Sequence, residues 1–188
     1  MGNTVGSACA NFCVFKSSVE DAYILGLWCA DGYWWSSSFG LSNMDKDLIN
    51  KFRIFFNKHF PRQRIKFDGS HIFVNSRPLL REFRAAREKI DKLEKASVIK
   101  AYFAGRFDGD GSVSKDLRSD CRIVYSNKKE TEIDKLLLEK IKITSTKTYY
   151  YKAARTFCLY ISRHEAEKFL EKILPYSVKT QKLAHIAP

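Results

Sequence analysis

This sequence has few acidic side chains for its number of basic ones. Its 188 residues include 21 Asp and Glu against 33 Lys and Arg, which leaves a net charge of +12. A compact protein must present such an excess on some surface, and a polyanion is the commonest partner of a surface with this charge. The shortage of acids therefore argues for a polyanionic partner.

Long apolar runs and paired cysteines are also missing. No stretch approaches the roughly 20 apolar residues that span a bilayer, and the first residues lack a basic-then-apolar secretion signal. The five cysteines are an odd number and show no CxxC spacing of a zinc site. Cys29 and Cys158 lie in apolar runs, so we expect buried thiols. We expect no membrane partner and a reducing, intracellular compartment, either an organelle (mitochondrion or chloroplast) or the prokaryotic cytoplasm.

An apolar segment that ends in Asp-Gly occurs twice, at 23–32 and 102–111. Small residues recur at every fourth position of each copy, and such positions share one face of a helix. Two helices with these faces can pack almost backbone to backbone. If they pair in parallel, Asp31 and Asp110 come to lie side by side at one end. The alternative is a pair of ordinary core helices in which Asp-Gly only forms a turn.

These two segments resemble the LAGLIDADG motif of homing endonucleases, with 24–32 and 103–111 on its nine positions. The resemblance implies an α+β protein of two subdomains, 1–94 and 95–188, related by a pseudo-twofold axis and joined by the two packed motif helices. Each subdomain would have the order α-β-β-α-β-β-α and a four-stranded antiparallel sheet. The two sheets would together form a saddle that rests in the major groove of DNA.

Patterns outside the motif support a duplication. Ser42-Asn43 matches Ser126-Asn127, and the segment 92–95 matches 179–182. Helix caps, apolar periodicity and turn residues predict the other elements. We expect one or two strands within 33–41, helices at 46–59, 78–93, 130–141 and 163–174, strands at 62–67, 70–75, 112–115, 122–126, 147–152 and 156–161, and a short tail after Pro175.

The resemblance assigns catalytic metal to the acid at the eighth motif position. Here this acid is Asp31 in the first copy and Asp110 in the second, with possible help from the backbone carbonyls of Ala30 and Gly109. Mg²⁺ suits such a site, because one or two carboxylates together with water and phosphate oxygens complete its shell. Mn²⁺ or Ca²⁺ could occupy the same positions.

The family also places a lysine and an amide near each scissile phosphate. The internal alignment puts the lysine at Lys92 and Lys179 and the amide at Asn43 and Asn127. Lys95 and Lys182 lie one turn away and are alternatives, and any of these lysines could instead be an ordinary surface residue.

Three motif positions depart from the family pattern. Cys29 stands where the first motif usually has an acid, whereas Asp108 keeps it, and we expect consequences for packing only. Trp28 and Arg106 are bulky where aliphatic residues are common, and we expect each to face its own subdomain.

Long polar side chains mark one face of the expected strands. In a ribbon that enters the major groove, Arg and Lys can read guanine and Asn can read adenine. A solvated sheet face would explain any one of them, but the set occurs in a strongly basic chain. The expected DNA contacts are Arg62, Arg64, Lys66, His71 and Asn75 in the first half, and Lys115, Arg118, Arg122, Lys147, Tyr149 and Lys152 in the second.

The sequence therefore predicts a monomeric, metal-dependent DNA endonuclease that makes a staggered double-strand break in a long, nearly asymmetric site. The retained acids favour this interpretation. Two alternatives with the same fold are an intron RNA maturase and a DNA-binding protein that does not cleave.

Overall fold

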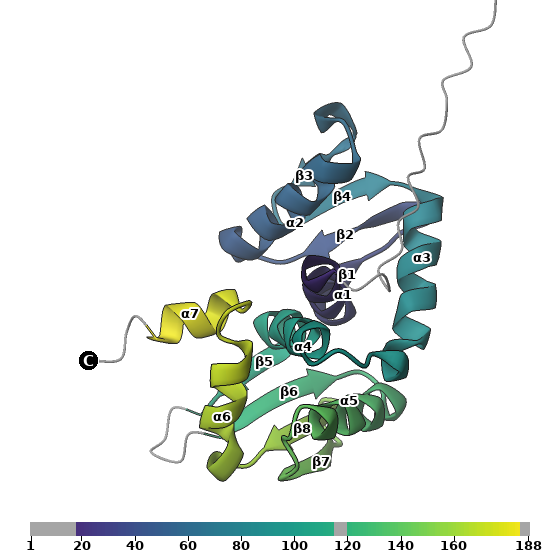
Figure 1. Ribbon diagram of the computed structural model, residues 1–188. Coiled ribbons are helices and arrows are strands. Elements are labelled where there is room, and N and C mark those ends of the chain that lie inside the picture. Colours follow the sequence, from purple (N-terminus) through teal and green to yellow (C-terminus); the bar gives the residue numbers. More distant parts are fainter. Residues whose placement is uncertain (1–17, 115–119, 185–188) are drawn as a thin grey trace, which may run out of the picture.

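The computed structural model describes residues 18–114 and 120–184, and within them the chain runs twice through the order helix, two strands, helix, two strands, helix. Figure 1 shows the first half above and the second half below a central pair of helices. The elements of the first half are α1 (Val19–Asp31), β1 (Gly32–Tyr33), β2 (Ser38–Ser42), α2 (Lys46–His59), the 3₁₀ turn η2 (Arg62–Arg64), β3 (Lys66–Asp68), β4 (His71–Asn75), α3 (Arg77–Glu88) and the 3₁₀ turn η3 (Ile90–Lys92).

The second half repeats this order and then adds one helix. Its elements are α4 (Ala96–Asp110), β5 (Gly111–Val113), β6 (Cys121–Tyr125), α5 (Lys128–Lys140), β7 (Thr146–Tyr151), β8 (Thr156–Ile161), α6 (Arg163–Ile173) and α7 (Val178–Ala184).

Each half has one four-stranded antiparallel sheet, with the orders β1-β2-β4-β3 and β5-β6-β8-β7. Gly32 directly follows α1 and pairs with Leu41, while Gly111 directly follows α4 and pairs with Ile123. The first strand of each half, β1 or β5, therefore starts from the same point relative to its motif helix. This confirms the predicted α+β fold of two repeats.

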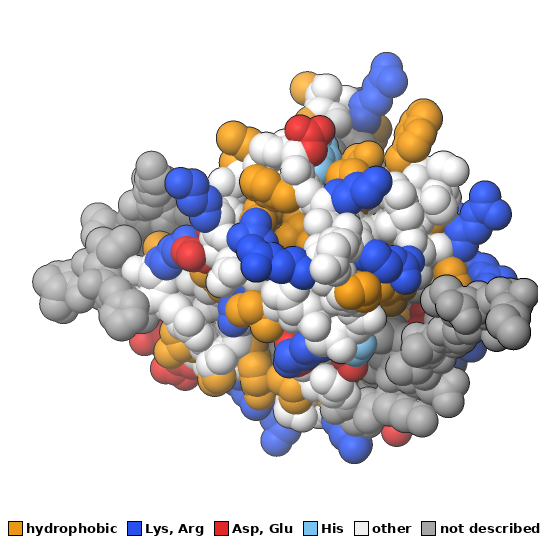
Figure 2. All heavy atoms as spheres, turned by 90° about the horizontal axis from the view of Figure 1, so that it is seen from above, with side chains coloured by type: hydrophobic (Ala, Val, Ile, Leu, Met, Phe, Trp, Pro, Cys, Tyr) orange, Lys and Arg blue, Asp and Glu red, His pale blue; other side chains and the backbone are white. Residues whose placement is uncertain are grey.

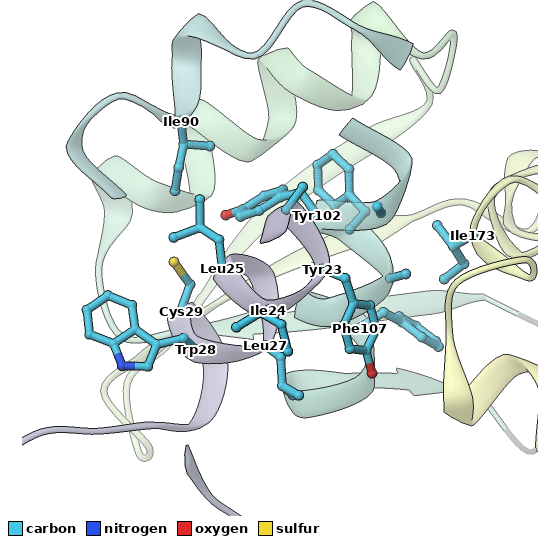
Figure 3. Packing of buried hydrophobic residues seen from close by; sticks show 14 of the residues in the cluster. Tyr23, Ile24, Leu25, Leu27, Trp28, Cys29, Ile90, Tyr102, Phe107 and Ile173 are labelled. Carbon is cyan, nitrogen blue, oxygen red and sulfur yellow. The ribbon is translucent and has the colours of Figure 1, made fainter. Parts of the chain in front are cut away.

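The two motif helices pack in parallel through their small residues. An added Cβ at Gly26 would lie 1.9 Å from the carbonyl oxygen of Tyr102, and one at Gly105 would lie 2.0 Å from that of Tyr23. Residues 22–29 of α1 are all buried, as expected for a helix that contacts protein on every side. Figure 3 shows these side chains pointing outward in different directions around α1.

The two halves fill their cores differently. In the first half Trp28 packs against Phe39 and Phe83, with ring centroids 5.5 and 5.7 Å apart. In the second half Arg106 is only 1% exposed and lies 3.4 Å from Asp134, with its guanidinium 4.3 Å from the ring centre of Tyr125. As predicted, Trp28 and Arg106 each face their own half.

Most predicted elements are confirmed to within two residues, and the strand predicted at 62–67 is the main exception. The 3₁₀ turn η2 occupies Arg62–Arg64, and only Lys66–Asp68 forms a strand. Arg62 and Arg64 therefore do not alternate with Lys66 on a strand face. Phe67 of β3 is 52% exposed because β3 is the edge of its sheet.

Three further differences concern helix ends. The helix predicted at 78–93 ends at Glu88 and continues as the turn η3. The helix predicted to start at 130 begins two residues earlier, after its cap Asn127. The tail predicted after Pro175 contains the helix α7, which its short length and polar sequence concealed.

Within residues 18–114 and 120–184, no helix is long and apolar enough to cross a membrane. Cys29, Cys121 and Cys158 are buried free thiols, which confirms the prediction for Cys29 and Cys158.

Candidate active site

The end of the helix pair brings the two motif acids together. Helices α1 and α4 end at Asp31 and Asp110, and each is followed at once by a strand. A Cβ at Gly109 would lie 2.4 Å from the Cβ of Ala30 and 2.9 Å from Oδ2 of Asp31. Only glycine at this position lets the Asp31 carboxylate lie across the end of α4.

Both acids hold their protons more tightly than usual. Burial is the largest cause for Asp110, and together with the nearby charge of Asp31 it raises the pKa of Asp110 to about 6. Burial also raises the pKa of Asp31, although a hydrogen bond from Asn43 and the charge of Lys179 act against this. Two half-buried carboxylates that repel each other form a place where a cation would be favourable.

The helix ends add to this negative potential. The C-terminal end of a helix carries a partial negative charge and unpaired carbonyl oxygens. Neither α1 nor α4 has a basic residue in its last turn, so their own sequences leave these charges uncompensated. The carbonyls of Ala30 and Gly109 belong to these last turns, where we expected them to assist a metal.

Asp31 and Asp110 fit a magnesium-type ion better than a zinc-type ion. No cluster of three or more His, Cys, Asp or Glu suitable for a metal exists in the described part of the chain. A zinc site would need such a cluster. Mg²⁺ does not, since it commonly binds one or two carboxylates and takes its other ligands from water and phosphate.

Asn43 is positioned on Asp31 by its neighbours. Its Nδ2 donates to Oδ2 of Asp31 at 2.7 Å, and its Oδ1 accepts from the backbone N–H of Asp45 at 2.7 Å. Asp45 in turn caps the start of α2. The amide predicted for the first site therefore lies beside the first acid.

Asn127 does not repeat this arrangement. Two residues beyond the pair Gly32–Leu41 lies Asn43, and two residues beyond the pair Gly111–Ile123 lies Tyr125. The hydroxyl of Tyr125 donates to Asp134 at 2.8 Å, while Asn127 caps α5 by accepting from the N–H of Glu130. The internal sequence alignment was therefore shifted by two residues at this point, and Asn127 corresponds to Asp45.

Lys179 lies at the acid-bearing end of α4. Its Nζ donates to the carbonyl oxygens of Phe107 at 3.0 Å and Gly111 at 2.6 Å. Burial lowers the pKa of Lys179, and the charges of Asp108, Asp31 and Asp110 oppose that shift. One lysine therefore sits close to both acids.

Lys92 lies far from this site. It belongs to η3, just before α4 begins at Ala96, and Asp110 is at the other end of that helix. At 1.5 Å per residue the helix places about 21 Å between these ends. The side chain of Lys92 is 75% exposed and pairs with Asp91, so the prediction for Lys92 is wrong. After α3 the chain must travel to the start of α4, whereas after α6 it is free to turn back.

The helix α7 and its anchor Asp108 were missed as parts of the site. The Asp108 carboxylate accepts from the N–H groups of Val178 and Lys179 at 2.8 and 3.0 Å and from the Ser177 hydroxyl at 2.5 Å. It also accepts from the hydroxyl of Tyr23 in the other motif helix at 2.7 Å. The acid retained at the sixth motif position was the available signal.

A second contact joins α7 to the first half. Nζ of Lys182 lies 2.9 Å from Asp45 and 2.7 Å from Asp47, at the start of α2. Lys182 therefore pairs with neither Asp31 nor Asp110. It contacts Asp45, the residue whose backbone N–H holds the Asn43 amide. The short helix bridges the surroundings of both acids.

The predicted DNA contacts of the first half lie partly on one sheet face. Strand register places Lys66, His71 and Asn75 on the face away from the helices. Arg62 lines a hollow of about 450 Å³ at the sheet edge. Arg64 instead donates to the carbonyl of Asn75 at 2.9 Å.

In the second half, Arg122, Lys147 and Tyr149 share the outer face of the sheet by register. Lys152 lies in the turn after β7 rather than on the strand. The expected contacts Lys115 and Arg118 fall outside the described residues. Figure 2 looks from above in the view of Figure 1, where the first half lies nearer, and on this side Lys and Arg side chains outnumber Asp and Glu and lie among hydrophobic ones.

Comparison with known proteins supports the fold and its repeat. Residues 97–174 match the family model described as a LAGLIDADG-like domain. The chain is 27% identical over 182 residues to the DNA-directed RNA polymerase subunit Rpo1C of Methanocaldococcus jannaschii. That match covers 89% of this chain and 20% of the subunit, so the chain spans about one fifth of that protein.

Solved structures match over most of their length. The complex of I-DmoI with DNA and Ca superposes with a TM-score of 0.71 at 19% identity, covering 89% of this chain and 97% of that one. The I-DmoI complex with DNA and Mn gives 0.66 at 20% identity, covering 83% and 96%. The N-terminal LAGLIDADG domain of DUF199/WhiA gives 0.63 at 17% identity, covering 84% of each chain. Residues 97–174 thus match the model of a LAGLIDADG-like domain, and the chain as a whole has the two-repeat fold seen in the I-DmoI structures.

Proposed function

We propose that this protein is a site-specific DNA endonuclease that hydrolyses one phosphodiester in each strand with the help of divalent metal. The observation that carries the proposal is the meeting of Asp31 and Asp110 at the end of the parallel helix pair. The acids come from one chain, so the proposed enzyme acts as a monomer. A basic, duplicated protein with two outward sheet faces supplies the complementary surface for duplex DNA.

The residues around the acids have separate proposed roles. A bound Mg²⁺ would supply an activated water and stabilise charge on the phosphate and the leaving oxygen. Asp31 and Asp110 would hold the ions, and Asn43 would keep the Asp31 carboxylate in one orientation. Lys179 would place a positive charge beside both acids, where it can also stabilise the phosphate.

The decisive experiment is cleavage of a randomised plasmid library with and without Mg²⁺. We expect staggered double-strand breaks at one sequence, in Mg²⁺ only. Asp31→Asn and Asp110→Asn should each lower the rate of double-strand cleavage at least about 100-fold while DNA binding persists, because removing charge removes metal but not the groove surface. A surviving nick would show that each acid serves one strand.

The control is Lys92→Ala, which changes a lysine at the far end of α4 and should cleave normally. Parental cleavage of both strands by either Asp variant would overturn the proposal. Tight, specific DNA binding without cleavage would instead favour a DNA-binding protein, and selective binding of structured RNA would favour a maturase.

A further inference from the structure

The outer face of the second sheet is rich in tyrosine. Its registered rows place Arg122 beside Tyr160 and Lys147, and Val124 beside Cys158 and Tyr149. Tyr151 lies in the next row of the same face, paired with Thr156. We call the six residues Arg122, Val124, Lys147, Tyr149, Tyr151 and Tyr160 the tyrosine face.

This face is open, although it carries apolar groups. Val124 is 37% exposed, Tyr149 45% and Tyr151 48%, whereas Ile123 and Leu159 on the opposite side of the same strands are fully buried. Tyr149 and Tyr160 meet edge to face with centroids 6.1 Å apart. The rings are therefore held by one another while their outer edges remain accessible.

The chemistry of the tyrosine face restricts what it can read. In the major groove a carboxylate accepts from cytosine and an amide pairs with adenine, whereas Arg and Lys bind guanine and apolar groups touch the thymine methyl. Across the described strand positions of this face there is no Asp, Glu, Asn or Gln. Asp120, which borders it, is 7% exposed and lies 3.4 Å from Arg122.

The first sheet lacks this restriction. Its outer face also carries aromatic rings, Tyr33 and Phe73, but Asp68, His71 and Asn75 lie at registered positions beside them, so it offers a carboxylate, an imidazole and an amide as well. The two half-sites of a target should therefore be read by different chemistry.

We propose that the tyrosine face reads its half-site through thymine methyl groups, with Arg122 and Lys147 at guanine or phosphate. The inference rests on the proposed binding of duplex DNA and adds the base class that one half-site must contain. A hollow of about 660 Å³ continues the face past Lys147 and Tyr149, lined by Ser162, Arg163 and His164, and offers room for the neighbouring backbone.

The test begins with duplexes selected from a random library by the full chain in EDTA, which prevents cleavage. The half-site of the second sheet is the one whose base preference or phosphate protection changes in Arg122→Ala. In that half-site each thymine is then replaced by deoxyuridine, which removes only the methyl group. We expect affinity to fall about fourfold for each contacted methyl. The same replacement in the other half-site should have a smaller effect, because Tyr33 and Phe73 of the first sheet are less exposed than Tyr149 and Tyr151 and pack on each other.

Two variants separate this reading from general loss of binding. The double variant Tyr149→Ser, Tyr151→Ser should bind thymine and deoxyuridine duplexes alike. The control Tyr150→Ser changes the intervening residue, which is 52% exposed and faces Phe157 at 4.8 Å on the other side of the strand, and should keep the preference.

Equal affinity of the parent protein for both duplexes would overturn the inference but leave DNA binding intact. A methyl preference that survives in the double variant would also overturn it. Preferential binding of unpaired strands would point to base stacking on the rings instead. Failure to select any duplex would overturn the proposed function itself.

Discussion

The two halves of this protein place the same acid at the same helix end but surround it differently. Asp31 receives a hydrogen bond from Asn43, whereas within the described residues no side chain or backbone group donates to the carboxylate of Asp110. The position that corresponds to Asn43 is Tyr125, which is committed to Asp134. Beside Asp110 the second half instead has Lys179 of α7, whose Nζ donates to the carbonyl oxygen of Gly111.

This difference shows which features the duplicated fold imposes. The helix pair and the strand that follows each helix are shared, because backbone contact at Gly26 and Gly105 leaves little freedom. The residues around the acids depend on where the chain goes next. After α3 it must reach the start of α4, whereas after α6 it turns back and α7 docks on Asp108.

The largest expected effect tests the backbone contact between α1 and α4 at Gly26 and Gly105, which we call the seam. Gly26→Leu and Gly105→Leu should each destabilise the protein by at least about 3 kcal/mol or prevent folding, because the new side chain would meet backbone rather than a movable side chain. Urea unfolding followed by circular dichroism measures this effect. Gly69→Asn is the control, since an added Cβ at that turn glycine would meet nothing within 4 Å and Asn tolerates its φ of +56°. Unequal results for the two glycines would break the symmetry of the seam.

The next effect contrasts the sixth motif positions. Asp108→Ala should cost on the order of 3 kcal/mol, because it leaves the buried donors of Tyr23, Ser177 and α7 without their acceptor. Cys29→Ala should lower the free energy of unfolding by only about 1 kcal/mol, because the buried Cys29 side chain is small and accepts no such bonds. Hydrogen exchange should show lost protection of α7 in Asp108→Ala alone. Equal unfolding energies would show that α7 is not held through Asp108.

A third prediction uses the unequal acids and requires metal-free buffer. The folded state raises the pKa of Asp110 from about 3.9 to about 6. It therefore binds the proton more tightly than the unfolded chain, and its stability falls as pH rises between about 4 and 6. Asp110→Asn should remove this loss and stabilise the protein at pH 7.5 by on the order of 1–2 kcal/mol.

Asp31→Asn is the matched control, because Asn43 already offsets part of the burial of Asp31. The difference in melting temperature between Asp31→Asn and the parent protein should grow less from pH 4 to pH 7.5 than the same difference for Asp110→Asn. A larger gain for Asp31→Asn would mean that folding raises the pKa of Asp31 more than the pKa of Asp110.

The smallest effect concerns the bridge between halves. Lys182→Met should cost at most about 1 kcal/mol, because Lys182 and its partners Asp45 and Asp47 are largely exposed and screened by water. Lys58→Met, which breaks an equally exposed pair with Glu20 inside the first half, is the control. If Lys182→Met alone lowers cleavage as well, the bridge orders Asn43 through Asp45.

Some features could be predicted because they are local. The two apolar segments, their small residues and their Asp-Gly ends indicated the helix pair, and cap residues such as Ser18 and Asp45 marked helix starts. Alternation predicted β7 and β8 almost to the residue. The strand predicted at 62–67 was wrong over its first residues, because an alternating pattern does not exclude a 3₁₀ turn. An edge strand can also leave an aromatic ring such as Phe67 in solvent.

The sequence by itself determined the repeat, since one segment occurs twice, and it placed on each copy a face of small residues and a terminal acid. The parallel pairing of the two helices, which brings Asp31 to Asp110, was an expectation of the family resemblance, and the contacts of Gly26, Gly105 and Gly109 show it in the structure. Only the tertiary structure decided which lysine and which amide accompany those acids. Asn43 and Tyr125 are equivalent by strand register, and Lys92 and Lys179 resemble each other in sequence yet lie at opposite ends of α4. Short motifs fix local geometry, but the partners of a site depend on the path of the chain between them, and that path is set by packing.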